Sequence, residues 1–195
     1  KKTVQLVSYA PHFISTVVMV GLILQFFDQR SGILNMLINA LGGESVYFMA
    51  KAEYFRPIYV WSGVWQGVGY SSIIYIAALS GISPELHEAA IVDGANILKR
   101  IWHVDLPGIA PTISILLIMS CGSILSVGYE KIYLMQNTIN LNYSEIISTY
   151  VYKQGIQQTQ YSFSTAVGLF NSVINLLLIA TVNQIARRVG ETSLW

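Results

Sequence analysis

The sequence predicts an all-α integral membrane protein, one domain over residues 1–195 with four transmembrane helices, and both composition and charge placement indicate this. Of the 195 residues, 53% are hydrophobic and 11% are charged, whereas about a quarter of the residues in a soluble domain are charged. The charges avoid long stretches: no Asp, Glu, Lys or Arg occurs in residues 3–27, 57–84, 108–129 or 154–186. Each stretch reaches the roughly 20 apolar residues that cross a bilayer core.

The first span is expected at about residues 4–27, with a kink near its start at Pro11. It follows Lys1-Lys2 and could be mistaken for a secretory signal peptide. Its apolar run is too long for that, and residues 26–30 offer no small-residue cleavage site. We therefore interpret it as a retained helix.

The second span is expected at about residues 58–82, after an external loop, 28–56, in which Gly32 and the pair at 42–43 signal turns. Within this span Gly63 and Gly67 form a small-xxx-small pair, which lets another helix approach closely. We favour helix packing over a direct role in transport for these glycines.

The third span is expected at about residues 108–128, and Pro111 falls in its first turns, where proline is tolerated. The lone Cys121 lies inside it, so disulfides and thiolate metal sites have no support. An aromatic and amide-rich external loop, 129–160, leads to the fourth span at about 161–185.

A charged loop of two short helices is expected at residues 83–107, between the second and third spans. Ser83 can cap a helix that begins at Pro84, with an acidic residue in its first turn. Gly94 tolerates the left-handed conformation that ends helices, and Asn96 can cap a second helix.

We expect Pro107 to stop that second helix. The same pattern could indicate a DNA-binding helix-turn-helix. The loop, however, has the wrong sign of charge for a phosphate backbone, at −2. The two bases Lys99 and Arg100 stand against the four acids Glu85, Glu88, Asp93 and Asp105. Nucleic acid is therefore excluded as a partner.

Charge placement also suggests an orientation. With four spans, both termini and loop 83–107 share one side, which carries six Lys and Arg against five on the other. This bias is weak, but Lys1-Lys2 and Arg187-Arg188 flank spans closely and favour a cytoplasmic location for this side.

The spacing of the loop is a recognisable motif: Glu88-Ala89-Ala90, three residues, Gly94, nine residues, then Val104-Asp105-Leu106-Pro107. It resembles the EAA loop of binding-protein-dependent ABC importer permeases, with Val104 where the pattern usually has Ile. Three further stretches are similar to the polysaccharide-type and oligosaccharide-type sugar permeases, namely residues 128–137, residues 148–152 with 161–166, and the tail 190–195.

The resemblance implies a type I ABC importer permease, a MetI-like helical bundle, in the cytoplasmic membrane of a bacterium. It implies a heterodimer with a second permease subunit, an extracellular or periplasmic sugar-binding protein, and cytoplasmic ABC ATPase subunits. Because the chain begins with Lys and such permeases usually have more than four spans, we expect further helices before this chain.

The resemblance also assigns loop 83–107 as the coupling loop to the ATPase. Glu88 would make a charge-assisted contact, and the small side chains of Ala89 and Ala90 would allow close approach. Gly94 would form the turn, and the motif is completed by Asp93, Leu106 and Pro107. The alternative is that Glu88 is a solvated surface acid, because surface ion pairs contribute little.

Catalytic chemistry has no support in the sequence. His12, His87 and His103 are far apart and have no Cys or carboxylate at ligand spacing, so no metal or other cofactor is expected. There is no Gly-x-Ser-x-Gly elbow and no Walker A loop. The chain is therefore expected to couple to ATP hydrolysis by a partner subunit rather than to perform it.

Uncharged polar residues inside the spans are candidates for a substrate path. Gln66 with Tyr70, and Asn171 with Asn175, each share a helix face at i,i+4 spacing, and Gln25 and Tyr75 complete the set. Amides pair with sugar hydroxyls, and aromatic rings stack on apolar sugar faces. The alternative is that these residues hydrogen-bond neighbouring helices.

Two other functions stay open at this stage. One is a stand-alone secondary transporter or channel for a neutral solute, although ion-driven carriers usually place carboxylates inside the membrane. The other is a membrane scaffold whose loop recruits a partner without transport.

Overall fold

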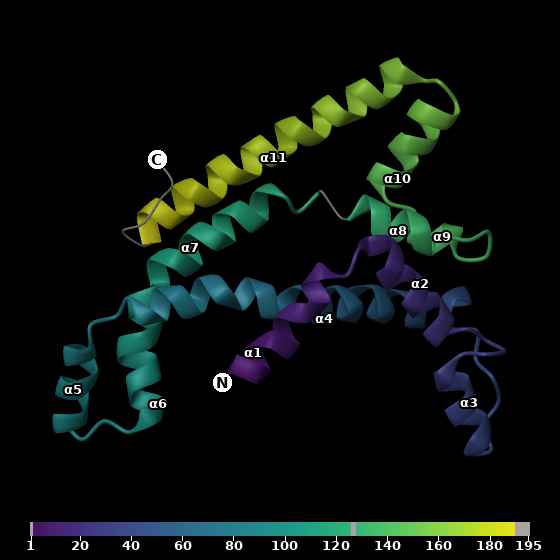
Figure 1. The fold of residues 1–195 in the computed structure, drawn as a ribbon. Coiled ribbons are helices and arrows are strands. Elements are labelled where there is room, and N and C mark those ends of the chain that lie inside the picture. Colours follow the sequence, from purple (N-terminus) through teal and green to yellow (C-terminus); the bar gives the residue numbers. More distant parts are fainter. Residues whose placement is uncertain (1, 126–127, 190–195) are drawn as a thin grey trace. The chain divides into compact units, whose positions relative to one another are not determined.

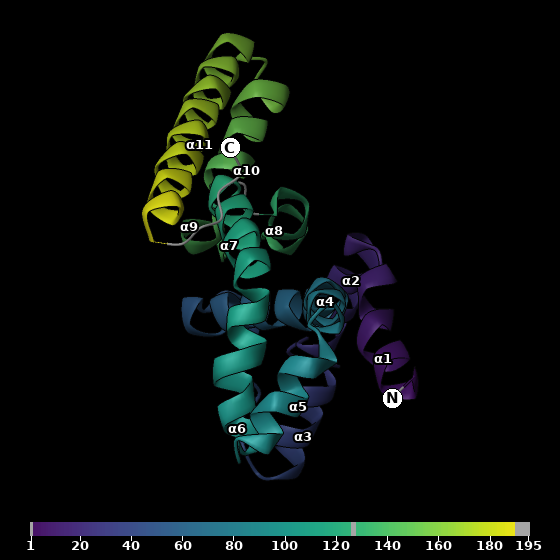
Figure 2. The same ribbon diagram turned by 90° about the vertical axis from the view of Figure 1, so that its left-hand side faces the viewer.

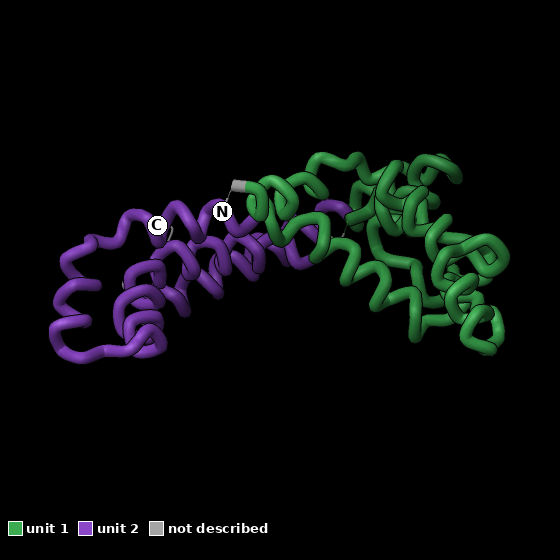
Figure 3. The backbone as a smooth tube through the Cα atoms, turned by 60° about the horizontal axis from the view of Figure 1, so that its bottom comes forward, with its two compact units in different colours: residues 1–70, 126–167 green, residues 71–125, 168–195 purple. Residues whose placement is uncertain are grey.

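The computed structural model describes residues 2–125 and 128–189 (Figure 1). Within these residues every regular element is helical, as the sequence predicts. Lys1, residues 126–127 of the third expected span, and the tail 190–195 lie outside the described residues. The contacts divide the chain into two compact units, residues 1–70 with 126–167 and residues 71–125 with 168–195 (Figure 3).

The first unit begins with a broken helix rather than a kinked one. Helix α1, Lys2–Tyr9, runs into a 3-10 turn, Ala10–Phe13, and α2, Thr16–Phe26, follows at a bend of 97°. Pro11 lies at the start of the 3-10 turn, and Ser15 caps α2 by accepting a hydrogen bond from the Val18 N–H. A proline followed four residues later by an N-cap ends one helix and starts another, which explains the sharp break.

Residues 28–56, expected as a loop, contain helix α3, Ile33–Ala40, and a 3-10 turn, Phe48–Ala50. Asn35 is fully buried and holds this segment together: its amide donates to the Asp28 and Val46 carbonyls and accepts from the Val46 N–H. Hydrogen bonds from Ser31 and the Arg30 N–H to the Asp28 carboxylate lower its pKa. The segment is therefore ordered by polar contacts of its own.

Helix α4, Ala52–Ser80, covers most of the second expected span; it starts six residues before that span and ends two residues before the end of it. Pro57 lies in its second turn and does not end it. The core of the first unit forms where α2 and the start of α4 meet helix α8, Tyr129–Met135. Its buried side chains are Met19, Val20, Ile23, Met49, Phe55 and Met135.

The expected external loop 129–160 is mostly helical. After α8 come α9, Leu141–Ser144, then α10, Ile147–Tyr152, and a π-helical turn, Lys153–Gln157. Lys131 of α8 is buried, and its ammonium donates to the Tyr59 carbonyl of α4 at 3.1 Å. Burial lowers the pKa of Lys131. This contact joins α8 to α4 within the unit.

The second unit corrects the prediction that Pro107 stops a helix. Helix α5, Pro84–Val92, is followed by α6, Ile97–Arg100, a π-helical turn, Ile101–Asp105, and α7, Leu106–Gly122. The Leu106 N–H bonds to the Ile101 carbonyl, five residues back. The wider turn makes room for the ring of Pro107 at the start of α7, so the helix continues.

Helix α11, Tyr161–Val189, is the last helix of the described residues, and its part in the second unit packs on α7. The packing is close at Gly122, where a Cβ atom would lie 2.4 Å from the side chain of Ile179. A side chain at this position would therefore require the Ile179 side chain to change its conformation or the two helices to separate.

Two helical stretches in the described residues are long and apolar enough to cross a membrane, Ile97–Gly122 and Tyr161–Arg188. The bent pair Thr3–Phe13 and Thr16–Phe26 makes a third if it counts as one span. Helix α4 has 29 residues, but its Gly, Ser, Tyr and Gln residues dilute its hydropathy. The four spans and the single-domain boundaries stay predictions.

Candidate functional site

The expected coupling loop is a helical hairpin, with α5 and α6 side by side (Figures 1 and 2). Ser83 caps α5 by accepting from the Glu85 N–H at 3.3 Å, and Pro84 is its first residue. Asn96 caps α6 by accepting from the Lys99 N–H at 2.9 Å. Both predicted caps are confirmed.

The turn between the two helices depends on Gly94, whose φ of 73° lies in the left-handed region. The Gly94 N–H bonds to the Ile91 carbonyl at 3.0 Å, and the Ala95 N–H bonds to the Ala90 carbonyl at 2.9 Å. These two bonds form a Schellman motif, with Asp93 as the C-cap and glycine at the following position. The turn predicted at Asp93-Gly94 is confirmed.

A polar contact missed by sequence reasoning joins the two limbs of the hairpin. His87 Nε2 of α5 lies 3.4 Å from Asp105 Oδ1, at the end of the π-helical turn. The sequence had suggested His87 only as an unsupported metal ligand. The sequence does contain a signal for this contact. His87 and Asp105 are complementary side chains, and the turn at Gly94 requires the two limbs that carry them to run antiparallel.

The hairpin exposes its motif residues among apolar side chains. Glu88 and Ala89 are exposed, and Ala90 is half-buried. The large exposed apolar side chains of the hairpin are Leu86, Ile91, Val92, Ile97, Leu98, Ile101 and Trp102. Val92 is 86% exposed and Trp102 67%, so this is an apolar surface rimmed by charge, which is typical of a protein interface.

Leu106 and Pro107, the last motif residues, are the first two residues of α7. Leu106 is half-buried and Pro107 is exposed. They lie where the hairpin passes into the long apolar helix. These two residues therefore connect the hairpin to α7 and are not part of the exposed apolar surface of the hairpin.

Three residues of the expected substrate path lie in the first unit. Gln25 is exposed on α2. On α4, Gln66 donates to the Ile14 carbonyl at 2.8 Å, and the Tyr70 ring stacks on His12 with centroids 3.9 Å apart. Gln66 and Tyr70 therefore both hold the broken N-terminal segment on α4. This favours the helix-bonding alternative for these two.

The other three lie in the second unit. Tyr75 is exposed on α4. The side-chain Oδ1 atoms of Asn171 and Asn175 on α11 are both buried and have no hydrogen-bond partner among the described residues. Two unsatisfied acceptors on one helix face are costly unless something outside the described residues bonds them. The path itself stays a prediction.

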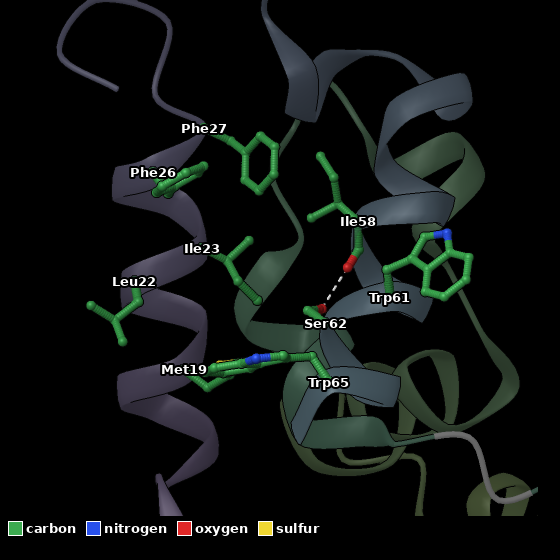
Figure 4. A pocket seen from close by; sticks show the side chains of 9 residues that line it. All are labelled: Met19, Leu22, Ile23, Phe26, Phe27, Ile58, Trp61, Ser62 and Trp65. Atoms are coloured by element: carbon green, nitrogen blue, oxygen red, sulfur yellow. Dashed lines mark hydrogen bonds between the residues drawn. The ribbon is translucent and has the colours of Figure 1, made fainter. Parts of the chain in front are cut away.

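An open groove of about 400 Å³ lies between α2 and α4 in the first unit (Figure 4). Its walls are apolar and aromatic, and the Ser62 hydroxyl in it is already bonded to the Ile58 carbonyl. Besides this hydroxyl, the polar side-chain groups of the lining are the indole N–H groups of Trp61 and Trp65, so the groove has few of the groups that orient a polar solute. Among the described residues, no cluster of three His, Cys, Asp or Glu could hold a metal ion.

Comparison with known proteins places these features in context. Residues 2–191 match the model of a family described as the binding-protein-dependent transport system inner membrane component. The chain is 43% identical to Protein LplB of Bacillus subtilis (strain 168) over all of its 195 residues. It is 42% identical over the same length to the polygalacturonan/rhamnogalacturonan transport system permease protein YteP of the same organism.

The chain spans 61% of the length of each of these two relatives. It is also similar to a chain in the crystal structure of a bacterial alginate ABC transporter in complex with an alginate pentasaccharide-bound periplasmic protein. That match has a TM-score of 0.95 and 40% identity, and it covers 99% of this chain and 67% of the other.

Proposed function

Because the chain belongs to the family of binding-protein-dependent transport system inner membrane components, we propose that it is part of the permease subunit of an ATP-driven oligosaccharide importer. Relatives named for polygalacturonan, rhamnogalacturonan and alginate support a carbohydrate as the transported solute. The match to ABC transporter chains speaks against the stand-alone transporter or channel.

The observation that carries this proposal is the exposed hairpin, Ser83 to Pro107. Its apolar surface needs a partner, and the small side chains of Ala89 and Ala90 let another protein come close to the helix backbone. Glu88 at the centre supplies a carboxylate for a charge-assisted hydrogen bond to a basic group. The partner in this proposal is a cytoplasmic ATPase, which hydrolyses ATP while this chain does not.

The hairpin is connected to the following membrane helix without a flexible linker. Its second limb is helical without interruption from Ile97 to Gly122, because the π-helical turn accommodates Pro107. The contact between His87 and Asp105 ties the first limb to that helix. A displacement of the hairpin by the ATPase would therefore reach the membrane helix as a rigid-body movement.

Two more partners complete the proposal: a second permease subunit, which shares the pathway, and a solute-binding protein, which delivers the sugar. Asn171 and Asn175 are the strongest candidates for contact with either the partner subunit or the solute. Their unsatisfied acceptors could receive hydrogen bonds from sugar hydroxyls or from a neighbouring helix.

The test compares two acids of α5 in the complete transporter. Glu88→Lys reverses the charge within the motif, whereas Glu85→Lys makes the same change in the first turn, outside the motif. We expect Glu88→Lys to reduce recovery of the ATPase with the permease, and ATP hydrolysis by the reconstituted complex, by about tenfold or more. Glu85→Lys should leave both close to wild type. If Glu88→Lys retained both, the coupling role would be wrong.

A further inference from the structure

An amphipathic pocket of about 420 Å³ lies in the folded segment after the third expected span, on the side of the membrane opposite the hairpin in the predicted topology. We propose that it binds an acidic sugar unit, a hexuronate, of an oligosaccharide, with Lys153 contacting the carboxylate. This rests on the proposed import function and names its substrate class. The lining residues are Tyr133, Leu134, Gln136, Asn137, Thr138, Leu141 and Lys153.

The lining has the chemistry that a pyranose ring needs. The Asn137 amide, two hydroxyls and an ammonium provide hydrogen bonds for the ring substituents, and an aromatic ring and two leucines provide an apolar surface for its faces. The Gln136 amide in the lining already donates to Ser144 and Thr149. The volume lies in the range of small-molecule sites. The groove between α2 and α4 has a similar volume but an almost entirely apolar lining without charged or amide side chains.

Lys153 gives the pocket an ammonium group with free N–H donors. Its ammonium donates one hydrogen bond to Glu145 Oε2 at 2.9 Å, and an ammonium has three N–H groups. Glu145 is not part of the lining. Burial raises the pKa of Glu145, but hydrogen bonds from Thr149 and Lys153 outweigh it and keep the carboxyl below its ordinary value. The cation of the lining is thus balanced by the adjacent Glu145 carboxylate, and a ligand carboxylate would use the remaining N–H groups of the ammonium.

Asn137 adds donors that are fixed in place. Its Oδ1 accepts from two backbone N–H groups, those of Ile139 at 2.9 Å and Asn140 at 2.8 Å. No bond of its Nδ2 to another described residue is recorded, so both amide hydrogens remain for a ligand. Donors from Asn137 and Lys153 on one pocket favour a ligand rich in acceptors, such as a carboxylate beside hydroxyls.

The backbone at Lys153 forms a π-helical turn, and this turn positions two residues of the pocket lining. Lys153 begins the π-helical turn, and Gln157 at the end of that turn donates to the Tyr133 hydroxyl at 3.1 Å. Shortly after it, Thr159 has a φ of 57°, which is costly for a β-branched residue. π-Helical turns are frequent at functional sites. Here the turn carries one lining residue and orients another.

The experiment titrates the purified complete transporter, without ATP or binding protein, with trigalacturonate and with its neutral methyl ester. Calorimetry should show the acid binding about tenfold more tightly than the ester, because a charge-assisted contact is worth a kcal/mol or two. Lys153→Met should remove this preference, and Lys153→Arg should keep it. Lys51→Met, an equal change at an exposed lysine outside the pocket, should have no effect.

In Lys153→Met, binding of the acid could fall because the ligand loses its contact with Lys153 or because Glu145, left without its partner, repels it. The double variant Lys153→Met with Glu145→Gln separates these two causes. It should lose the preference for the acid as Lys153→Met does, and Asn137→Ala should weaken both ligands. Retention of the preference in Lys153→Met, or equal binding of acid and ester by the wild type, would overturn the assignment. So would loss of binding-protein docking alone, which would make the pocket a protein interface.

The two proposals fail separately. Recovery of the ATPase and ATP hydrolysis depend on the hairpin, so they should be unchanged in the Lys153 and Asn137 variants. Absence of saccharide binding with intact ATPase coupling would reject the hexuronate pocket and leave the import function standing.

Discussion

The hairpin 83–107 and the segment 129–157 are both short-helix assemblies, but opposite kinds of contact hold them. In the hairpin, all of which is described, no residue of α5, α6 or the π-helical turn is buried. Its shape comes from two N-caps, a glycine turn and the His87 contact with Asp105. In segment 129–157, buried side chains tie every helix to another part of the unit.

The polar network of segment 129–157 shows the difference most clearly. Asn140 is fully buried, accepts from the Asn137 N–H and the Ser144 hydroxyl, and donates to the Met135 carbonyl. Gln136 donates to the Ser144 carbonyl and to Thr149. Such a network fixes one conformation by itself. The hairpin instead leaves its apolar surface open, which suits a large protein partner, whereas the network presents a preformed pocket.

The largest expected effect is from Asn140→Ala, which should break the network and leave the hairpin untouched. Several buried groups would lose their hydrogen-bond partners at once, which should lower the free energy of unfolding by about 3 kcal/mol. Hydrogen exchange should show faster exchange across segment 129–157 and no change in the hairpin. Asn142→Ala, at an exposed position of the adjoining helix α9, is the control. Equal exchange in the two variants would contradict the role of the network.

Gly94→Val should act in the opposite sense, loosening the hairpin and sparing segment 129–157. A valine at a φ of 73° costs about 1–2 kcal/mol. The expected result is faster hydrogen exchange at the end of α5 and reduced recovery of the ATPase. Gly94→Asn should largely restore both, because Asn tolerates the left-handed conformation. If Val and Asn behaved alike, backbone conformation would not be the reason for glycine here.

This contrast also explains which parts of the structure the sequence could predict. The hairpin signals are local: a cap residue, a proline at the first position and a glycine at the turn each act within a few residues, and Ser83, Gly94 and Asn96 all behave as expected. Helices α9 and α10 have four and six residues, too short for a hydrophobic period to appear. They are held by distant partners, so an amide-rich sequence looked like a loop.

Two differences between the sequence prediction and the structure have local causes. Proline interrupts α-helices, so the sequence predicts a stop at Pro107, but the π-helical turn before it allows the helix to continue. The sequence predicts a kink at Pro11, whereas the structure has a break after Phe13, where the cap residue Ser15 starts a new helix. For the site, the EAA spacing located the hairpin, whereas the pocket near Lys153 depends on contacts between separate short helices.

A smaller effect is expected from Asn96→Ala, which removes the cap of α6. The Lys99 N–H would lose its acceptor, and the cost is about 1 kcal/mol. Hydrogen exchange should speed up in the first turn of α6, with a modest loss of ATPase recovery. Asn96→Asp keeps an accepting oxygen and should match the wild type. An unchanged α6 in the alanine variant would mean that the partner-free hairpin is held by α7 rather than by its own caps.

The smallest expected effect is a pH dependence confined to segment 129–157. The folded state holds the pKa of Glu145 below its ordinary value of 4.5, so the ionised carboxylate contributes stability above that pH. The contribution is lost as the pH falls through the lowered pKa, because the protonated carboxyl no longer binds Lys153 as an anion. Hydrogen exchange of α10, corrected for intrinsic rates, should therefore rise below pH 4.5 in the wild type and stay flat in Glu145→Gln.

Two controls test whether this response belongs to Glu145. Replacing Glu130, an exposed acid on α8, by Gln should keep the wild-type dependence. The hairpin should show no such step from this group, since Glu145 belongs to the other unit. A step that survives Glu145→Gln would assign the pH response to a different carboxyl.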